Sequence, residues 1–312
     1  MKNEMKLNPF VVVAALLMAL PLGAGAQEYR TRIDTTVRLD RGGAVDLSLI
    51  SGKIRVTGWD RPDVKVSASI DRGMLRFDAN SSRVTLSVDQ SDDDRGRRHH
   101  NIGDARYEVS IPRGSRLILE AVSGDINASG SQGEIEASSV SGDVDVTAGV
   151  REVSVEAVSG SVHAAQINGN LRAETVSGDV RVETVTGNVE ATSVSGNIRL
   201  IGVQSKDVRT ETVSGDVVYS GTIESGGKYS FESHSGTVRL NIPRGAGAQF
   251  SVETFSGDIS TDFPVTVAPR KRREGRMEFT IGDGRARVTA QTFSGRIVIN
   301  SGSDSTTRRD DE

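Results

Sequence analysis

The chain contains no cysteine and few aromatic residues. Without cysteine it can form no disulfide, no thiolate metal site and no cysteine nucleophile. Aromatic residues make up 4% of its 312 residues and apolar residues 36%, whereas an average soluble domain has roughly 45–50% apolar residues. A large aromatic-rich core is therefore excluded, but a thin core of valine, isoleucine and alanine is allowed. The 38 basic and 42 acidic residues nearly balance, which gives no indication of nucleic-acid binding.

The one long apolar run lies at the N-terminus. Lys2 and Lys6 precede the run Phe10–Leu22, and a small-residue cleavage motif, A-G-A, follows at 24–26. This order is typical of a signal peptide over residues 1–26, so we expect the mature chain to begin at Gln27. A membrane anchor is the alternative, but the run is shorter than the ~20 residues that span a bilayer. We therefore expect an exported protein, periplasmic, outer-surface or secreted, with no transmembrane segment in the mature chain.

A short phrase of the type Val-Ser-Gly-Asp-Val dominates the rest of the sequence. Its first regular glycines fall at 124, 142, 160, 178 and 196, with a constant spacing of 18 residues. The later steps are 19, 21 and 21, and then 38, or two steps of 19. Weakened copies at Gly133, Gly169 and Gly187 lie nine residues beyond a repeat glycine. The unit is thus nine residues long and is used twice in each 18-residue coil.

The phrase has the chemistry of a strand followed by a turn. Apolar and polar residues alternate in Val180–Thr184, as in a half-buried strand. Ser-Gly-Asp suits a turn, since glycine tolerates positive φ and the flanking side chains can bond to the local backbone. One coil cannot bury its own apolar face, so successive coils are expected to stack. The sequence predicts an all-β fold, a β-solenoid or β-helix-like stack of coils over residues 111–300; a β-sandwich is the alternative.

The flanks of this predicted stack are less regular. Residues 27–110 are expected to form an N-terminal β cap region, which contains an early copy of the phrase, Ile50–Ile54. The single tryptophan, Trp59, is predicted to cover the first coil, because an open solenoid end invites strand pairing. The alternative role for Trp59 is that of an exposed, ligand-stacking ring. Residues 301–312 are polar and are predicted to form a disordered tail.

Two strongly charged segments interrupt the pattern. Ser91–Asn101 combines an acidic run, a basic run and the pair His99-His100. A solvated loop is favoured there over a metal site, because adjacent histidines are a weak metal signal. Pro269–Arg276 is basic and suits contact with anionic envelope polymers, although a solvated hairpin loop is the favoured interpretation.

Stacking would place the repeated carboxylates in columns. The position after the repeat glycine is acidic in Asp125, Asp143, Asp179, Asp216 and Asp258. The position four before it is acidic in Glu120, Glu156, Glu174, Glu211, Glu232 and Glu253. Neutral residues interrupt both columns, which is typical of a solvated face. Calcium between coils is a minor alternative, because about one carboxylate per turn falls short of the six to eight oxygens that Ca²⁺ takes.

No residue stands out as catalytic, cofactor-binding or metal-ligating. Glycoside hydrolysis needs two placed carboxylates, and repeated carboxylates single out no pair. His163 and His234 occupy ordinary strand or turn positions of the repeat, so no Ser-His-Asp triad is selected. The sequence also has no phosphate-binding loop, no dinucleotide fingerprint and no H-E-x-x-H motif.

The repeated phrase, the segment G-K-I-R-V-T-G-W-D at Gly52–Asp60 and the I-P-R-G segments at Ile111 and Ile242 resemble the DUF4097 family. These are bacterial β-strand-repeat proteins described as "putative adhesins". The resemblance covers roughly Tyr29–Asn300. It implies a β-solenoid-like fold and a cell-envelope location, and it brings no catalytic residues. Some relatives are encoded near envelope-stress regulators, which implies a scaffold or sensor-accessory role.

We therefore predict a non-enzymatic, exported cell-envelope protein, an adhesin or binding scaffold that presents a repetitive Ser/Thr/Asp/Glu surface. Its expected partners are envelope or extracellular proteins or glycans, and not nucleic acid. The alternatives are an accessory component of envelope-stress signalling and a β-helix carbohydrate-active enzyme. The sequence names neither the ligand nor the oligomeric state.

Overall fold

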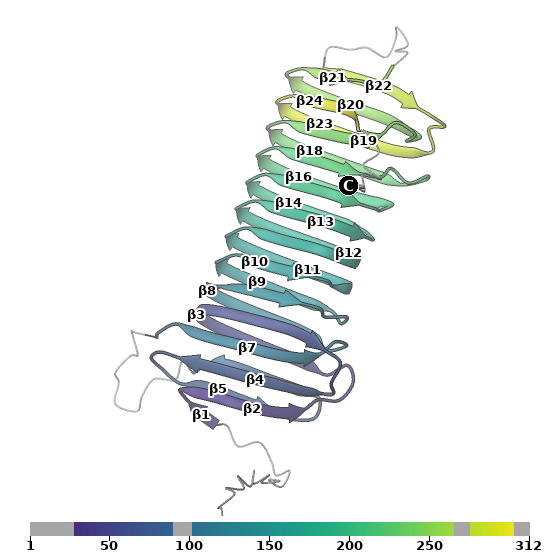
Figure 1. Cartoon of the computed structure of the whole chain (residues 1–312). Coiled ribbons are helices and arrows are strands. Elements are labelled where there is room, and N and C mark those ends of the chain that lie inside the picture. The colour runs from purple at the N-terminus through teal and green to yellow at the C-terminus, as the bar shows by residue number, and fades with distance from the viewer. Residues whose placement is uncertain (1–27, 90–101, 265–274, 303–312) are drawn as a thin grey trace, which may run out of the picture.

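A computed structural model describes residues 28–89, 102–264 and 275–302. These residues form 24 strands and no helix, and hence no helix that could cross a membrane. The strands stack into a long column with the N-terminal end at one extremity (Figure 1), so the predicted all-β solenoid-like fold is confirmed. The predicted signal peptide, His99, His100, residues 265–274 of the basic segment and residues 303–312 lie outside the described residues.

Each coil contributes one strand to each of two faces, and the strands within a face are parallel. Inward side chains of both faces fill one continuous core. The first face contains β9 (Ile135–Ser141), β11 (Val150–Ser159), β14 (Val189–Ser195), β16 (Asp207–Ser214) and β18 (Lys228–Ser235). The second face contains β10 (Val144–Thr147), β13 (Val180–Thr186), β15 (Ile198–Val203), β17 (Val217–Gly221) and β19 (Val238–Pro243). The long strands β8 (Arg116–Ser129) and β12 (Val162–Ser177) pass from one face to the other.

The stack begins within the region N-terminal to residue 111. β3 (Ala44–Trp59) spans a whole coil and pairs with β8 so that Ser51 lies beside Ser123 and Gly52 beside Gly124. β6 (Arg83–Val88) and β7 (Ala105–Pro112) pair with the other side of β3. Antiparallel strands then close this end: β1 (Glu28–Arg30), β2 (Arg32–Arg38), β4 (Asp63–Ile70) and β5 (Leu75–Ala79).

Trp59 does not cover the end of the solenoid, so this prediction was wrong. Its strand, β3, is enclosed between β7 and β8, because the chain returns outside β3 after leaving it. The indole Nε1 donates to the carbonyl oxygen of Asp63 at 2.7 Å, and the Arg61 guanidinium lies 5.0 Å from the ring centroid. Trp59 therefore anchors a half-buried corner, with a cation over one face of its ring.

The C-terminal coils are not stacked in chain order. After β19 the chain forms β20 (Ala248–Ser256) and β21 (Ile259–Thr261), and then β22 (Arg276–Ile281), which is antiparallel to β20. β23 (Ala286–Ser294) and β24 (Ile297–Gly302) then return and insert between the coil of β18 and β19 and that of β20 and β21. The glycine step of 38 is therefore an outward and return excursion and not two successive steps of 19.

Both I-P-R-G segments mark a skipped coil. The amide of Ser115 donates to Pro112 O at 3.0 Å, and that of Ala246 donates to Pro243 O at 3.1 Å, so each segment forms the same tight turn. The first turn leads from β7 to β8, past the slot that β3 fills. The second leads from β19 to β20, past the slot that β23 and β24 fill. A duplicated sequence thus builds the same topological step at the two ends.

The core is narrow and mainly aliphatic, with its aromatic residues gathered near the C-terminal end. Tyr219 packs against Phe231 and Tyr229, with ring centroids 5.0 and 6.2 Å apart. Its hydroxyl donates to the carbonyl oxygen of Thr222 at 2.6 Å, and desolvation by burial raises its pKa well above the usual range. Buried Tyr107 is perturbed in the same direction by the same cause. Both phenols therefore act as neutral packing and donor groups.

Candidate binding surface

The repeated phrase lies at the corner where the chain passes from the first face to the second. Three of its positions have a clear structural role, and one does not. We take the repeat glycine as the reference and consider the position three before it, the position after it, and the position two before it.

The hydroxyl three positions before the glycine ties each coil to its neighbour. Ser139 donates to the carbonyl oxygen of Gly124 at 3.0 Å, Thr175 to that of Gly160 at 3.0 Å, and Thr212 to that of Gly196 at 3.1 Å. Ser193, Ser233, Thr254 and Thr292 make the equivalent bond. This row of buried hydroxyls satisfies carbonyl groups that the bend removes from the strand ladder.

The aspartate after the glycine has a related role. The Oδ1 atom of Asp143 accepts the amide of Ser161 at 2.8 Å, and that of Asp179 accepts the amide of Asn197 at 2.8 Å. Asn197 takes the place of an aspartate and accepts the amide of Asp216 at 3.0 Å. These side chains are thus engaged with the backbone of the next coil. Among residues 28–89, 102–264 and 275–302, no group of three His, Cys, Asp or Glu residues is arranged to hold a metal ion.

The position two before the glycine points outward and has no such bond. Between 43% and 49% of the side chain is exposed at each of five successive valines and at Val213. Together with the residues that continue the row, these form what we call the apolar ridge: Val122, Val140, Val158, Val176, Val194, Val213, His234, Phe293 and Phe255. Since neighbouring coils lie about 4.8 Å apart, the ridge is a nearly continuous apolar line along the column.

The ridge becomes aromatic at its C-terminal end. The rings of His234 and Phe293 stack at 4.8 Å and 5°, and those of Phe293 and Phe255 at 4.8 Å and 4°. Phe255, at the end of this stack, is 79% exposed. A groove of about 1050 Å³ runs beside the rings, and its other wall includes Glu211, Glu232 and Glu253. The inserted coil of β23 creates this stack, because it places Phe293 between His234 and Phe255.

Carboxylates border the ridge on both sides. On the first face they form the glutamate row, Glu120, Glu156, Glu174, Glu211, Glu232 and Glu253, interrupted by Ser138, Thr192 and Gln291. On the turn side lies the aspartate row, Asp125, Asp143, Asp179, Asp216 and Asp258, with Lys53 and Arg296 as its basic members. Some glutamates have arginine neighbours, such as Arg172 at 2.6 Å from Glu174 and Arg209 at 3.6 Å from Glu211. The strip nevertheless carries a clear excess of negative charge.

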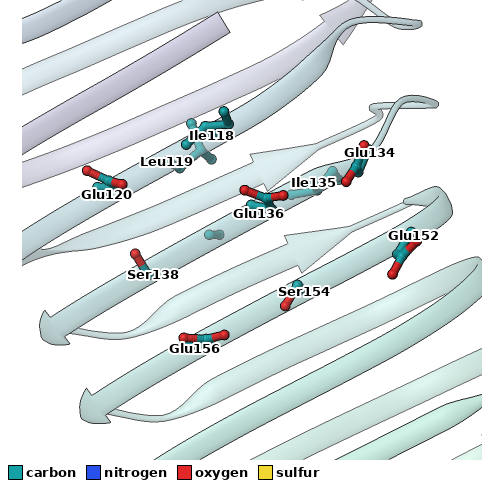
Figure 2. Close-up of a pocket in the computed structure, with 11 residues that line it drawn as sticks. Ile118, Leu119, Glu120, Glu134, Ile135, Glu136, Ser138, Glu152, Ser154 and Glu156 are labelled. Carbon is teal, nitrogen blue, oxygen red and sulfur yellow. The ribbon is translucent and has the colours of Figure 1, made fainter. Parts of the chain in front are cut away.

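A second hollow lies on the first face near its N-terminal end (Figure 2). Its acidic lining comes from successive strands: Glu120, Glu134, Glu136, Glu152 and Glu156. Arg116 reaches Glu136 at 2.7 Å and Glu134 at 3.6 Å, and these contacts raise the pKa of the guanidinium. Figure 2 shows the carboxylates spread over the strands and not converging on one point.

The two histidines considered in the sequence do not meet. His163 lies on the second face, with Nδ1 3.1 Å from Asp145 and Nε2 3.9 Å from Glu183. His234 lies in the ridge, stacked on Phe293. The sequence interpretation concentrated on the acidic columns and missed the ridge. The missed signal is the phase of β8, where Leu117, Leu119 and Ala121 point inward, so that Val122 must point outward.

Comparison with known proteins gives a family and two solved structures. The family model described as Toastrack DUF4097 matches residues 44–300. A "putative cell adhesion protein" from Clostridium sporogenes ATCC 15579 is 12% identical, with a TM-score of 0.26, over 86% of this chain and 99% of that one. A "putative adhesin" from Bacteroides fragilis NCTC 9343 is 13% identical, with a TM-score of 0.35, over 86% and 96%. No curated protein sequence matches the chain significantly.

Proposed function

The chain belongs to the Toastrack DUF4097 family, and we propose that it is an exported, non-catalytic envelope protein that binds a partner along its apolar ridge. The observation that carries this proposal is the ridge. Strand positions that face water usually hold polar residues, yet here the outward position holds valine in six successive coils and phenylalanine in two. Exposed apolar surface of this extent typically marks an interaction site.

The other positions of the phrase support the same function. The hydroxyl, glycine and aspartate positions each have a structural role, whereas the valine makes no coil-to-coil hydrogen bond that would require it. The carboxylates are distributed in rows and not gathered in a cleft (Figure 2), and acid–base hydrolysis requires a placed pair. A repetitive line that can be contacted at many points suits binding and not catalysis.

Export is tested by expressing the full chain in a Gram-negative host and determining the N-terminus of the product. We expect a processed chain that begins at Gln27 and is recovered from the periplasm or the medium, because residues 1–26 have the order of a signal peptide. Recovery of the intact chain, with its first residues retained in the cytoplasm, would contradict the exported location.

Binding is tested with a triple variant, Val158→Thr, Val176→Thr and Val194→Thr. Threonine keeps the β-branched shape and strand preference of valine but removes its apolar surface. We expect binding of the purified chain to envelopes of the producing bacterium to fall at least about tenfold, on the order of 1.4 kcal/mol. The measurement is a sedimentation binding curve.

The matched control removes outward apolar residues from the second face: Ile201→Thr, Val218→Thr and Val298→Thr. This variant should bind envelopes like the parent chain. Circular dichroism melts of both variants verify that the fold is retained. Equal binding by the parent and by the ridge variant would refute the proposal.

A further inference from the structure

The charge pattern around the apolar ridge defines the kind of partner that fits it. The ridge is one side chain wide, and it is bordered by the glutamate row on one side and the aspartate row on the other. A complementary partner therefore needs a narrow apolar line with basic groups along both of its edges.

We propose that the ridge binds a basic amphipathic α-helix of a partner protein, laid along the column. This proposal rests on the proposed function and specifies its partner. A helix places apolar side chains on one stripe with a rise of about 5.4 Å per turn, which is close to the spacing of about 4.8 Å between coils. Lysine and arginine on the two flanks of that stripe would face the two carboxylate rows.

The C-terminal end of the ridge provides the strongest contact for such a helix. The groove of about 1050 Å³ there is lined on one wall by His234, Phe293 and Phe255 and on the other by Glu211, Glu232 and Glu253. A large apolar side chain can fill the groove while a neighbouring ammonium or guanidinium group pairs with a glutamate. Buried aromatic anchors of this kind usually dominate binding energy.

Other occupants fit these observations less well. A second copy of this chain would bring glutamate and aspartate rows against similar rows, and like charges repel. Nucleic acid and anionic lipid surfaces are disfavoured for the same reason. A neutral sugar stacks on an open aromatic face, but Phe293 is covered on one face by His234 and on the other by Phe255.

The test measures binding of the full, purified chain to a labelled 21-residue helical peptide by fluorescence anisotropy. The peptide carries leucine at heptad positions a, d and e and lysine elsewhere. One control peptide has glutamate in place of every lysine, and a second has serine in place of every leucine. We expect the basic amphipathic peptide to bind at least tenfold more tightly than either control, with an affinity that falls as salt is raised.

Two variants locate the site. Phe255→Ser with Phe293→Ser should weaken binding of the basic peptide at least tenfold, since both rings are exposed in the free protein. Glu211→Gln, Glu232→Gln and Glu253→Gln together should remove most of the salt dependence. The matched control, Glu134→Gln, Glu136→Gln and Glu152→Gln, alters the same number of charges on the same face and should leave the affinity unchanged.

The outcomes separate the partner from the function. If the acidic helix binds as well as the basic one, or if the phenylalanine variant binds normally, the proposed partner is wrong. An extended Lys-Val peptide that binds more tightly than the helix would also overturn the helical geometry. In each case the envelope experiment with the valine variant still decides independently whether the ridge binds anything.

Discussion

Replacing Gly178 with alanine is expected to destabilise the chain by about 3 kcal/mol or more, one of the largest effects of any single substitution in the stack. A Cβ atom at this position would lie 2.1 Å from the carbonyl oxygen of Gly160 and 2.6 Å from its carbonyl carbon. Gly178 does not have a positive φ, so the effect is steric. The measurement is the free energy of unfolding from urea titration.

The obstructing atoms belong to the backbone and cannot rotate away. The amide of Gly178 donates to Ser195 O at 3.2 Å, and that of Gly160 donates to Ser177 O at 3.2 Å. Separating the two coils to admit a methyl group would lengthen such bonds and loosen the stacked turns. A change at one glycine is therefore expected to weaken the neighbouring coils as well.

Gly245→Ala is the matched control for this prediction. It also lies in a turn, but an added Cβ would meet no atom within 4 Å. Its cost should stay within roughly 0.5 kcal/mol. If both variants unfold at the same urea concentration as the parent, close packing between coils does not require glycine at this position of the phrase.

The central coils could be predicted from sequence because their signals are local. The constant glycine spacing, the alternation in segments such as Val180–Thr184 and the turn chemistry all describe one coil, and each coil is a copy of the next. The early phrase at Ile50–Ile54 also falls in register with Ser123 and Gly124. Repetition thus makes residue spacing equivalent to position in the stack.

The ends could not be predicted, because there the order in space departs from the order in the chain. The turn at Pro112–Ser115 has the same local geometry whether the next strand enters the adjacent slot or the one beyond it. Which slot is free depends on distant strands, β3 at one end and β23 at the other. The same reason explains why Trp59 was misplaced and why the stack of Phe293 on His234 and Phe255 was not foreseen.

The second bend of each coil shows a further limit of sequence reasoning. Ala148, Gln166 and Thr184 occupy equivalent places 18 residues apart, and each has a positive φ, between 54° and 58°. Glycine would be expected at such places, and for a β-branched residue like Thr184 the conformation is rare. Stacking on the neighbouring coils imposes the same backbone shape whatever the residue, so composition alone does not reveal the bend.

The second large effect is expected from Phe231→Ala, which should cost about 3–5 kcal/mol of unfolding free energy. Phe231 is fully buried and packs at 5.0 Å from the ring of Tyr219. Its neighbours in the two adjoining coils are the small residues Thr210 and Ala290. Neither can expand into the space that the phenyl ring leaves, so the variant retains a cavity.

Phe255→Ala provides the control, because the same side chain is removed from a site that is 79% exposed. Its unfolding free energy should remain within roughly 0.5 kcal/mol of that of the parent. Phe231→Leu keeps most of the volume and should fall between the two. Equal stability of the two alanine variants would mean that the aromatic cluster does not support the C-terminal coils.

Hydrogen exchange should also show where the effect of Phe231→Ala is felt. In a stacked repeat each coil contacts only its neighbours, so stability is distributed locally along the column. We expect faster amide exchange in β16, β18 and β23, which surround the cavity, and unchanged exchange in β9 and β11. The affected coils are those that carry His234, Phe293 and the groove, so this variant should also weaken binding at the aromatic end of the ridge. Uniformly faster exchange along the whole chain would show instead that the solenoid unfolds as a single cooperative unit.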